Sequence, residues 1–290
     1  MNGWLNIYKP KNTNSAHIVA IVKRAFKGLK TGHAGTLDPL AEGVLPIALG
    51  EATKLADMLV SAEKTYEFTV KFGARTESGD LGSEVIETTD ALVAKGEIEK
   101  IIPKFIGEIT QTPSKFSAIK IKGVRAYKLA RSGAEVAMPS RKIHIYSLKL
   151  LSFNEIEQTA TLIAECSKGT YIRSLGEDIA FSLQNLGHVI ELKRLAVGKF
   201  VAQNAIDLTK LDLQLDMQQI YDQILPVDFV LDDILVINVV EDIALRIRNG
   251  QKVNIQNSQD GLSAVYCNGI LCAIGEIESG LFKIKRVFNL

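Results

Sequence analysis

Apolar and polar residues follow two periods along this chain, and each period predicts a different element. Between Ser15 and Lys27 the apolar residues recur at helical spacing, which predicts a helix capped by Ser15 and ended by Gly28. From Tyr66 to Phe72 aromatic and aliphatic residues alternate with polar ones, as in a strand with one buried face. By the same criteria, strands are expected over residues 143–151 and 159–166, and helices over residues 97–105 and 173–186.

The last sixty or so residues have a different pattern, with short apolar runs separated by tight turns. Asn268-Gly269 is the dipeptide that type I′ hairpin turns favour, and Ser279-Gly280 predicts a second hairpin. We therefore expect two domains, residues 1–232 and 233–290. The predicted fold class is α+β, with a mainly antiparallel mixed sheet flanked by helices, followed by a small β-rich domain that packs against the larger one.

Composition excludes several classes of protein. With 47% hydrophobic and 23% charged residues, the 290-residue chain is ordered and globular rather than disordered. No apolar run approaches the ~18 residues of a membrane-spanning helix, and the N-terminal residues do not resemble a secretory signal, so a cytoplasmic location is expected. Three cysteines without C-x-x-C spacing, Cys166, Cys267 and Cys272, argue against a disulfide framework or a zinc knuckle.

The formal net charge of +1 conceals two basic segments. Residues 1–36 carry six Lys or Arg and no acid, and residues 114–149 carry nine against one acid, Glu135. Residues 205–245 are acidic. This segregation fits a protein with one face toward a polyanion, although solvated surfaces explain any single block about equally well. Phosphate-loop, dinucleotide-loop, nucleophile-elbow and zinc-protease motifs are missing, and the four histidines are scattered, so we predict no metal.

One loop stands out for its chemistry, residues 30–40, KTGHAGTLDPL. Gly32 and Gly35 permit tight turns, and Pro39 restricts Asp38 to extended conformations. Such a loop can bring His33 and the Asp38 carboxylate close together and present the carboxylate to a ligand. The simpler interpretation is that Asp-Pro starts a turn.

The motif GHAGTLDPLA at residues 32–41, followed by GVLP at 43–46 and GEATK at 50–54, resembles the catalytic motif of the bacterial tRNA pseudouridine-55 synthases of the TruB type. The resemblance continues through Tyr66, QTPS at 111–114, SKGTYIR at 167–173 and residues 188–197. The end of the chain resembles the family's PUA-like RNA-binding domain in pattern. The sequence departs from the family at Asn12, where a glycine is usual, and around Gly82.

The resemblance implies a role for three catalytic residues. Asp38 corresponds to the nucleophile, which attacks the base or the sugar C1′. Arg173 corresponds to the arginine that pairs with this aspartate, and an arginine fork suits a carboxylate that must be oriented. Tyr66 corresponds to the tyrosine that stacks on the target base. Each has an ordinary alternative, such as an exposed arginine at a helix start or a core aromatic on a strand.

The resemblance also implies substrate-binding positions. His33 fills the space that the flipped nucleotide leaves, and Tyr171 and Leu192 sandwich the base, although Leu192 equally suits a core position. Lys9 and Lys120 complete the predicted binding residues. The implied activity is isomerisation of uridine 55 in the T arm of tRNA, by a monomer without cofactor or protein partner. A related synthase acting on another RNA, or a tRNA-binding module without catalysis, remains the alternative at this point.

Overall fold

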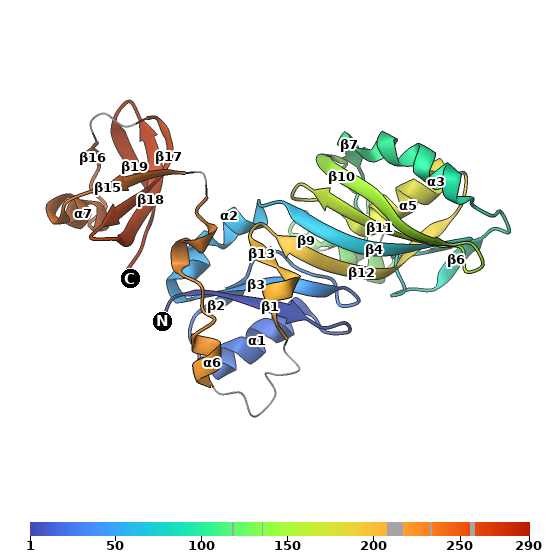
Figure 1. The fold of residues 1–290 in the computed structure, drawn as a ribbon, viewed down its shortest axis with the longest axis horizontal. Coiled ribbons are helices and arrows are strands. Elements are labelled where there is room, and N and C mark those ends of the chain that lie inside the picture. Colours follow the sequence, from blue (N-terminus) through green and yellow to red (C-terminus); the bar gives the residue numbers. More distant parts are fainter. Residues whose placement is uncertain (118, 135, 208–216, 233, 256–258) are drawn as a thin grey trace.

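The computed structural model describes residues 1–117, 119–134, 136–207, 217–232, 234–255 and 259–290. A ten-stranded sheet extends through the N-terminal two thirds of the chain, and a five-stranded sheet lies at one end of the molecule (Figure 1). Two short two-stranded sheets complete the strands, β5 (Ala74–Thr76) with β6 (Val85–Thr88) and β8 (Lys120–Ile121) with β9 (Val124–Arg125). Within the described ranges, no helix is both long enough and apolar enough to span a bilayer.

The large sheet is mixed and mainly antiparallel, as predicted. Its strand order is β14-β1-β3-β12-β4-β11-β10-β7, with β2 paired to β3 and β13 paired to β12. The pairs β1–β14 and β3–β12 are parallel, and the other described pairs are antiparallel. Its strands are β1 (Gly3–Lys9), β2 (Thr31–His33), β3 (Glu42–Leu49), β4 (Lys64–Phe72), β7 (Gly107–Gln111), β10 (Arg141–Asn154), β11 (Thr159–Cys166), β12 (Gly187–Val197), β13 (Phe200–Val201) and β14 (Ile206–Asp207).

Helices cover this sheet because their apolar faces need a partner surface. Helix α5 (Ile172–Ser182) packs against β4 and β12, and α3 (Lys95–Ile101) packs against β10 (Figure 1). Helix α1 (Ser15–Ala25) shares a second cluster with β1 and β3. The remaining described helices are α2 (Ala56–Val60), α4 (Ala126–Arg131), α6 (Met217–Tyr221), α7 (Glu241–Arg248) and the 3₁₀ turns η1 (Gly50–Leu55), η2 (Ile102–Phe105), η3 (Ala202–Asn204) and η5 (Val227–Val230).

The start of α1 corrects one prediction. Asn14, not Ser15, caps the helix, because Asn14 has an extended backbone and its side chain accepts a hydrogen bond from the His17 amide at 2.8 Å. The Ser15 hydroxyl is instead bonded to both the amide and the carbonyl of Leu37. Ser15 therefore ties the helix to the loop that carries Asp38.

Two other helices are shorter than predicted. In the segment 97–105 the α-helix gives way to the 3₁₀ turn η2, because Pro103 has no amide hydrogen for the α-helical bond. Helix α5 ends at Ser182 rather than Leu186, because Gln184 has a left-handed φ of 56°. The Asn185 side-chain oxygen then accepts the Leu186 and Gly73 amides, which ties the segment after α5 to the residue after β4.

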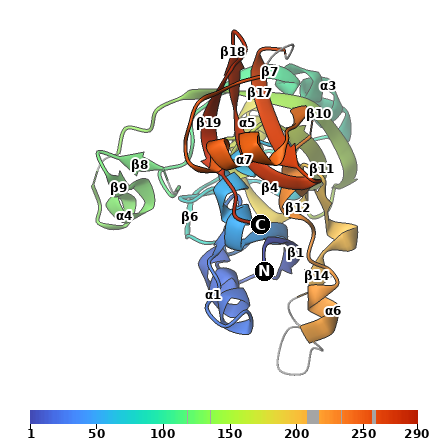
Figure 2. The ribbon, with the colours of Figure 1, turned by 90° about the vertical axis from the view of Figure 1, so that its left-hand side faces the viewer.

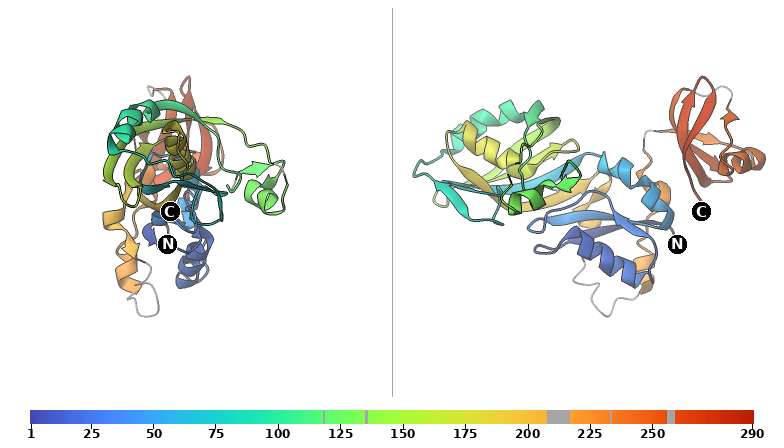
Figure 3. Two further views of the ribbon diagram at one scale, coloured as in Figure 1. Left: turned by 90° about the vertical axis from the view of Figure 1, so that its right-hand side faces the viewer. Right: turned by 180° about the vertical axis from the view of Figure 1, so that it is seen from behind.

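Residues 112–140 leave the sheet between β7 and β10 and form an arm that contains β8, β9 and α4. Figures 2 and 3 show this arm projecting from the body of the molecule. It holds nearly all of residues 114–142, the part of the basic segment 114–149 that we expect to contact RNA, and of these Ala118 and the acidic Glu135 lie outside the described residues.

The C-terminal sheet has the order β15-β17-β18-β19-β16, and both predicted hairpins share its central strand β18. Asn268 and Gly269 have φ values of 51° and 77°, as a type I′ turn requires. Ile274 and Phe288 join Trp4 in one buried cluster, so this unit packs against the rest of the chain. The strands are β15 (Leu235–Asn238), β16 (Val253–Asn254), β17 (Gly261–Cys267), β18 (Ile270–Glu278) and β19 (Leu281–Val287).

Candidate active site

Asp38 lies in the loop between β2 and β3, and that loop is held from two sides. Leu37 is bonded to Ser15 of α1, and the Pro39 carbonyl accepts the Asn12 amide at 2.8 Å. Asn12 has a φ of 61°, a left-handed conformation that glycine favours and asparagine tolerates, so the departure from the family at this position keeps the turn. The loop presents an Asp38 side chain that is 41% exposed.

Arg173 meets Asp38 as predicted, from the first turn of α5. Its Nε lies 3.0 Å from Asp38 Oδ2, and its side chain is only 6% exposed. The same guanidinium lies 3.4 Å from Asp80 Oδ2 and donates to the Ser78 and Phe116 carbonyl oxygens at 3.0 and 3.2 Å. A planar fork with five donors can satisfy these acceptors at once, which fixes the orientation of the Asp38 carboxylate.

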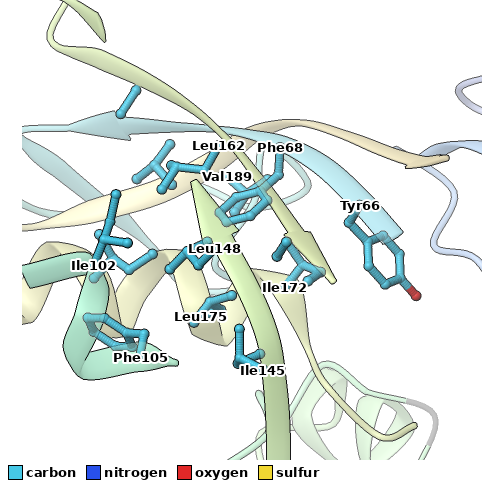
Figure 4. Close-up of a cluster of buried hydrophobic side chains, with 14 of the residues drawn as sticks. Tyr66, Phe68, Ile102, Phe105, Ile145, Leu148, Leu162, Ile172, Leu175 and Val189 are labelled. Carbon is cyan, nitrogen blue, oxygen red and sulfur yellow. The ribbon is translucent and has the colours of Figure 1, made fainter. Parts of the chain in front are cut away.

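Five of the predicted residues surround one cavity of about 330 Å³. They come from four segments that are distant in the sequence, because Tyr171 and Arg173 both stand at the start of α5, and they are Asp38, Tyr66, Tyr171, Arg173 and Leu192. Tyr66 lies near the start of β4, and its hydroxyl points away from the other labelled side chains of the large-sheet core (Figure 4). Tyr66 is therefore both a core aromatic and part of the cavity wall, and its stacking on a base stays a prediction.

The aromatic walls of this cavity are held by neighbouring groups. Burial raises the pKa of Tyr66, while the positive charge of Arg194 opposes the rise. The Gln111 amide both donates to the Tyr171 carbonyl and accepts from the Tyr171 amide, at 3.0 and 2.8 Å. The Arg141 guanidinium lies 5.3 Å from the centre of the Tyr171 ring.

His33 opens onto a second cavity of about 710 Å³, which Asp38 and Arg173 also line. Burial, with a contribution from Arg194, lowers the pKa of His33, so the imidazole is neutral near pH 7. Its Nδ1 is buried and has no hydrogen-bond partner in the described part of the chain. Asp38 and Arg173 line both cavities, whereas Tyr66 lines only the smaller of the two and His33 only the larger.

The two predicted lysines lie apart from these cavities. Lys9 is fully buried, and its ammonium donates to the carbonyl oxygens of Pro10, Thr13 and Pro39, so it braces the loop and does not reach the cavity. Burial lowers the pKa of Lys9 to about 8. Lys120 is exposed on the arm, next to Ile119, which does line the smaller cavity.

Sequence reasoning missed three residues of the site, Asp80, Lys64 and Arg194. Lys64 and Arg194 line the smaller cavity, and burial lowers the pKa of Lys64 to about 8. A usable signal existed for Arg194, which is a charged residue beside the apolar run Leu195-Ala196-Val197. The sequence around Asp80 gives no such signal, because Gly79 and Gly82 indicate only that Asp80 lies in a loop.

Comparison with known proteins places these residues in a family. Residues 23–172 match the model of the "TruB family pseudouridylate synthase (N terminal domain)". A tRNA pseudouridine synthase B from Rickettsia bellii is 50% identical over 99% of this chain and 98% of its own. The corresponding protein of Rickettsia akari is 47% identical over 100% of this chain and 99% of its own.

The fold also matches a solved structure. One chain of an H/ACA RNP bound to a substrate RNA containing 2′-deoxyuridine superposes with a TM-score of 0.73, over 99% of this chain and 85% of that one. Its sequence identity is 21%, so this likeness concerns the fold alone.

Proposed function

Because the chain belongs to the TruB family of pseudouridylate synthases, we propose that it converts uridine 55 in the T arm of tRNA to pseudouridine, with Asp38 as the nucleophile. The observation that carries this proposal is the Asp38 carboxylate, which lies 3.0 Å from Arg173 and lines a cavity together with two tyrosines.

The reaction explains why these residues are needed together. The bond between uracil N1 and the sugar C1′ must break, the base must turn, and C5 must join C1′. An oriented carboxylate supplies a nucleophile for a transient covalent species, and neither redox chemistry nor phosphoryl transfer is involved. The cavity walls of Tyr66, Tyr171 and Leu192 suit a base that has left its stack, and no cofactor is required.

Binding of the tRNA is assigned to charged surfaces around the site. The arm carries Lys120, Lys122 and Arg125 on an exposed hairpin. Exposed Lys23 and Arg24 lie in the last turn of α1, and exposed Lys27 follows the helix. Such surfaces attract phosphates without reading sequence. We assign residues 1–232 to catalysis and residues 233–290 to a PUA-like RNA-binding domain, with Asp233 itself outside the described residues. The proposed active species is a monomer without a protein partner.

The decisive experiment maps pseudouridine in unmodified tRNA incubated with the purified protein. The expected product is pseudouridine at position 55 in stoichiometric yield, without added cofactor. Pseudouridine only at another position contradicts the T-arm assignment. Tight tRNA binding with no pseudouridine at any position would identify a binding module instead.

A further inference from the structure

Arg194 is a buried cation at the point where three strands of the large sheet meet. It lies on β12, opposite Tyr66 of β4 on one side and Gly43 of β3 on the other. Its side chain is among the largest that are fully buried, at 1% exposure. Within the described ranges it forms no ion pair, so no carboxylate there neutralises its charge.

The donors of Arg194 reach backbone oxygens on both sides of the catalytic loop. Nε donates to the Val44 carbonyl at 2.8 Å, at the start of β3. One terminal nitrogen donates to Gly35 at 3.0 Å, and the other reaches Thr36 at 3.4 Å. The guanidinium thus connects residues 35 and 36, which lie just before Asp38, to β3, which follows Asp38.

The same guanidinium also acts on Tyr66. Arg194 and Tyr66 are directly opposed on antiparallel strands, and such residues present their side chains to the same face. The positive charge of Arg194 opposes the rise that burial causes in the pKa of Tyr66. Arg194 lines the cavity with Asp38 and Tyr66. One planar group therefore connects the loop of the nucleophile to the aromatic wall opposite it.

We propose that Arg194 is a positioning residue, which sets the distance between the Asp38 loop and Tyr66 so that a base in the cavity meets both. This rests on the proposed function of Asp38 and Tyr66. A lysine places all its donors on one atom and cannot span the carbonyl oxygens of Val44, Gly35 and Thr36 together, so the planar fork itself is required. Misplacement of reacting groups by about 1 Å typically costs about a hundredfold in rate.

The test compares Arg194→Met and Arg194→Lys, which keep most of the side-chain bulk, with the parent protein. Single-turnover pseudouridine formation at saturating tRNA should slow by about ten- to a hundredfold in both variants. The Kd for tRNA should stay within about threefold of the parent value, because the phosphate contacts lie elsewhere. Lys193→Met is the matched control, because Lys193 is the adjacent residue of β12 and pairs with Glu67 at 3.3 Å instead. It should keep the parent rate.

Several outcomes overturn the proposal. They are a parental rate in either folded variant, a full return of rate with lysine, or a drop in tRNA affinity that accounts for the slower rate. If thermal denaturation shows that neither variant folds, Arg194 is a stabilising residue only, and the proposal fails. The Asp38→Asn variant distinguishes failure of the proposed function from failure of the Arg194 inference. If Asp38→Asn is active, the proposed function is wrong. If Asp38→Asn is inactive but the Arg194 variants are fully active, only the inference about Arg194 is wrong.

Discussion

Arg173 holds two carboxylates at once, with Asp38 Oδ2 at 3.0 Å and Asp80 Oδ2 at 3.4 Å from its guanidinium nitrogens. Asp38 is 41% exposed and faces the cavities, whereas Asp80 is only 14% exposed. Asp80 also accepts from the Ser78 hydroxyl and the Gly82 amide at 2.5 and 2.8 Å. The Asp80 carboxylate thereby fixes the position of Arg173, and Arg173 orients the more exposed Asp38 carboxylate.

Asp38→Asn should abolish turnover while leaving tRNA binding intact. The amide keeps the volume of the side chain but cannot act as an anionic nucleophile. Affinity depends on phosphate contacts spread over a large surface, to which a negative charge contributes nothing favourable. Pseudouridine formation and the Kd for tRNA are the two measurements, with Asp90→Asn, outside both cavities, as control. Product formed near the parent rate would remove Asp38 as the nucleophile.

Arg173→Lys should reduce kcat by a factor on the order of 10² to 10³ but leave a trace of activity. A single ammonium cannot contact Asp38, Asp80 and the two backbone carbonyls together, so Asp38 keeps a cation nearby but its orientation is no longer fixed. Long incubations at saturating tRNA detect the residual product. A kcat close to the parent value would show that charge alone suffices.

The arm should account for part of the salt dependence of tRNA affinity. Replacing Lys120, Lys122 and Arg125 by Ala should flatten the slope of log K against log salt, by up to about one unit for each phosphate that is no longer neutralised. Exposed Lys95, Lys100 and Lys104, near α3 on another side of the molecule, form a matched triple (Figure 2). Equal slopes for the arm triple and the parent would place the arm off the RNA.

The sequence patterns predict α1, β4, β10 and β11 because each of these elements has one buried face. They do not reveal β3, since seven of its eight residues are buried and no alternation is left to detect. Asp38 and Arg173 are linked in the sequence only through the family resemblance. Lys64 and Asp80 cannot be found without coordinates, because their contacts are to backbone carbonyls and loop groups that no spacing rule contains. For Arg194 the apolar neighbours in the sequence indicate burial, but its carbonyl partners also require coordinates.

Phe288→Ala should destabilise the protein by about 3–5 kcal/mol, because the ring is fully buried in the cluster that joins the C-terminal sheet to Trp4 and its neighbours. Phe181→Ala is the matched control, since that ring is 81% exposed and should cost little. Chemical denaturation measures both. Equal stability of the two variants would mean that the C-terminal sheet does not depend on this contact.

Glu177→Gln should make the stability of the protein less dependent on pH. Burial raises the pKa of Glu177 to about 7, with Arg75 and Arg173 opposing the rise. Because this is above the ordinary value of 4.5, the folded state binds the extra proton between about pH 4.5 and 7, and stability contributed by the protonated group is lost as pH rises through 7.

Glutamine imitates the protonated carboxyl at every pH. The variant should therefore match the parent at pH 5 and exceed it at pH 8 by about 1–3 kcal/mol, at 1.36 kcal/mol per pKa unit. Thermal unfolding at the two pH values measures the difference, with the exposed Glu84→Gln as control. If the variant gains as much stability at pH 5 as at pH 8, the raised pKa is contradicted. A gain that does not depend on pH comes from packing and not from the protonation of Glu177.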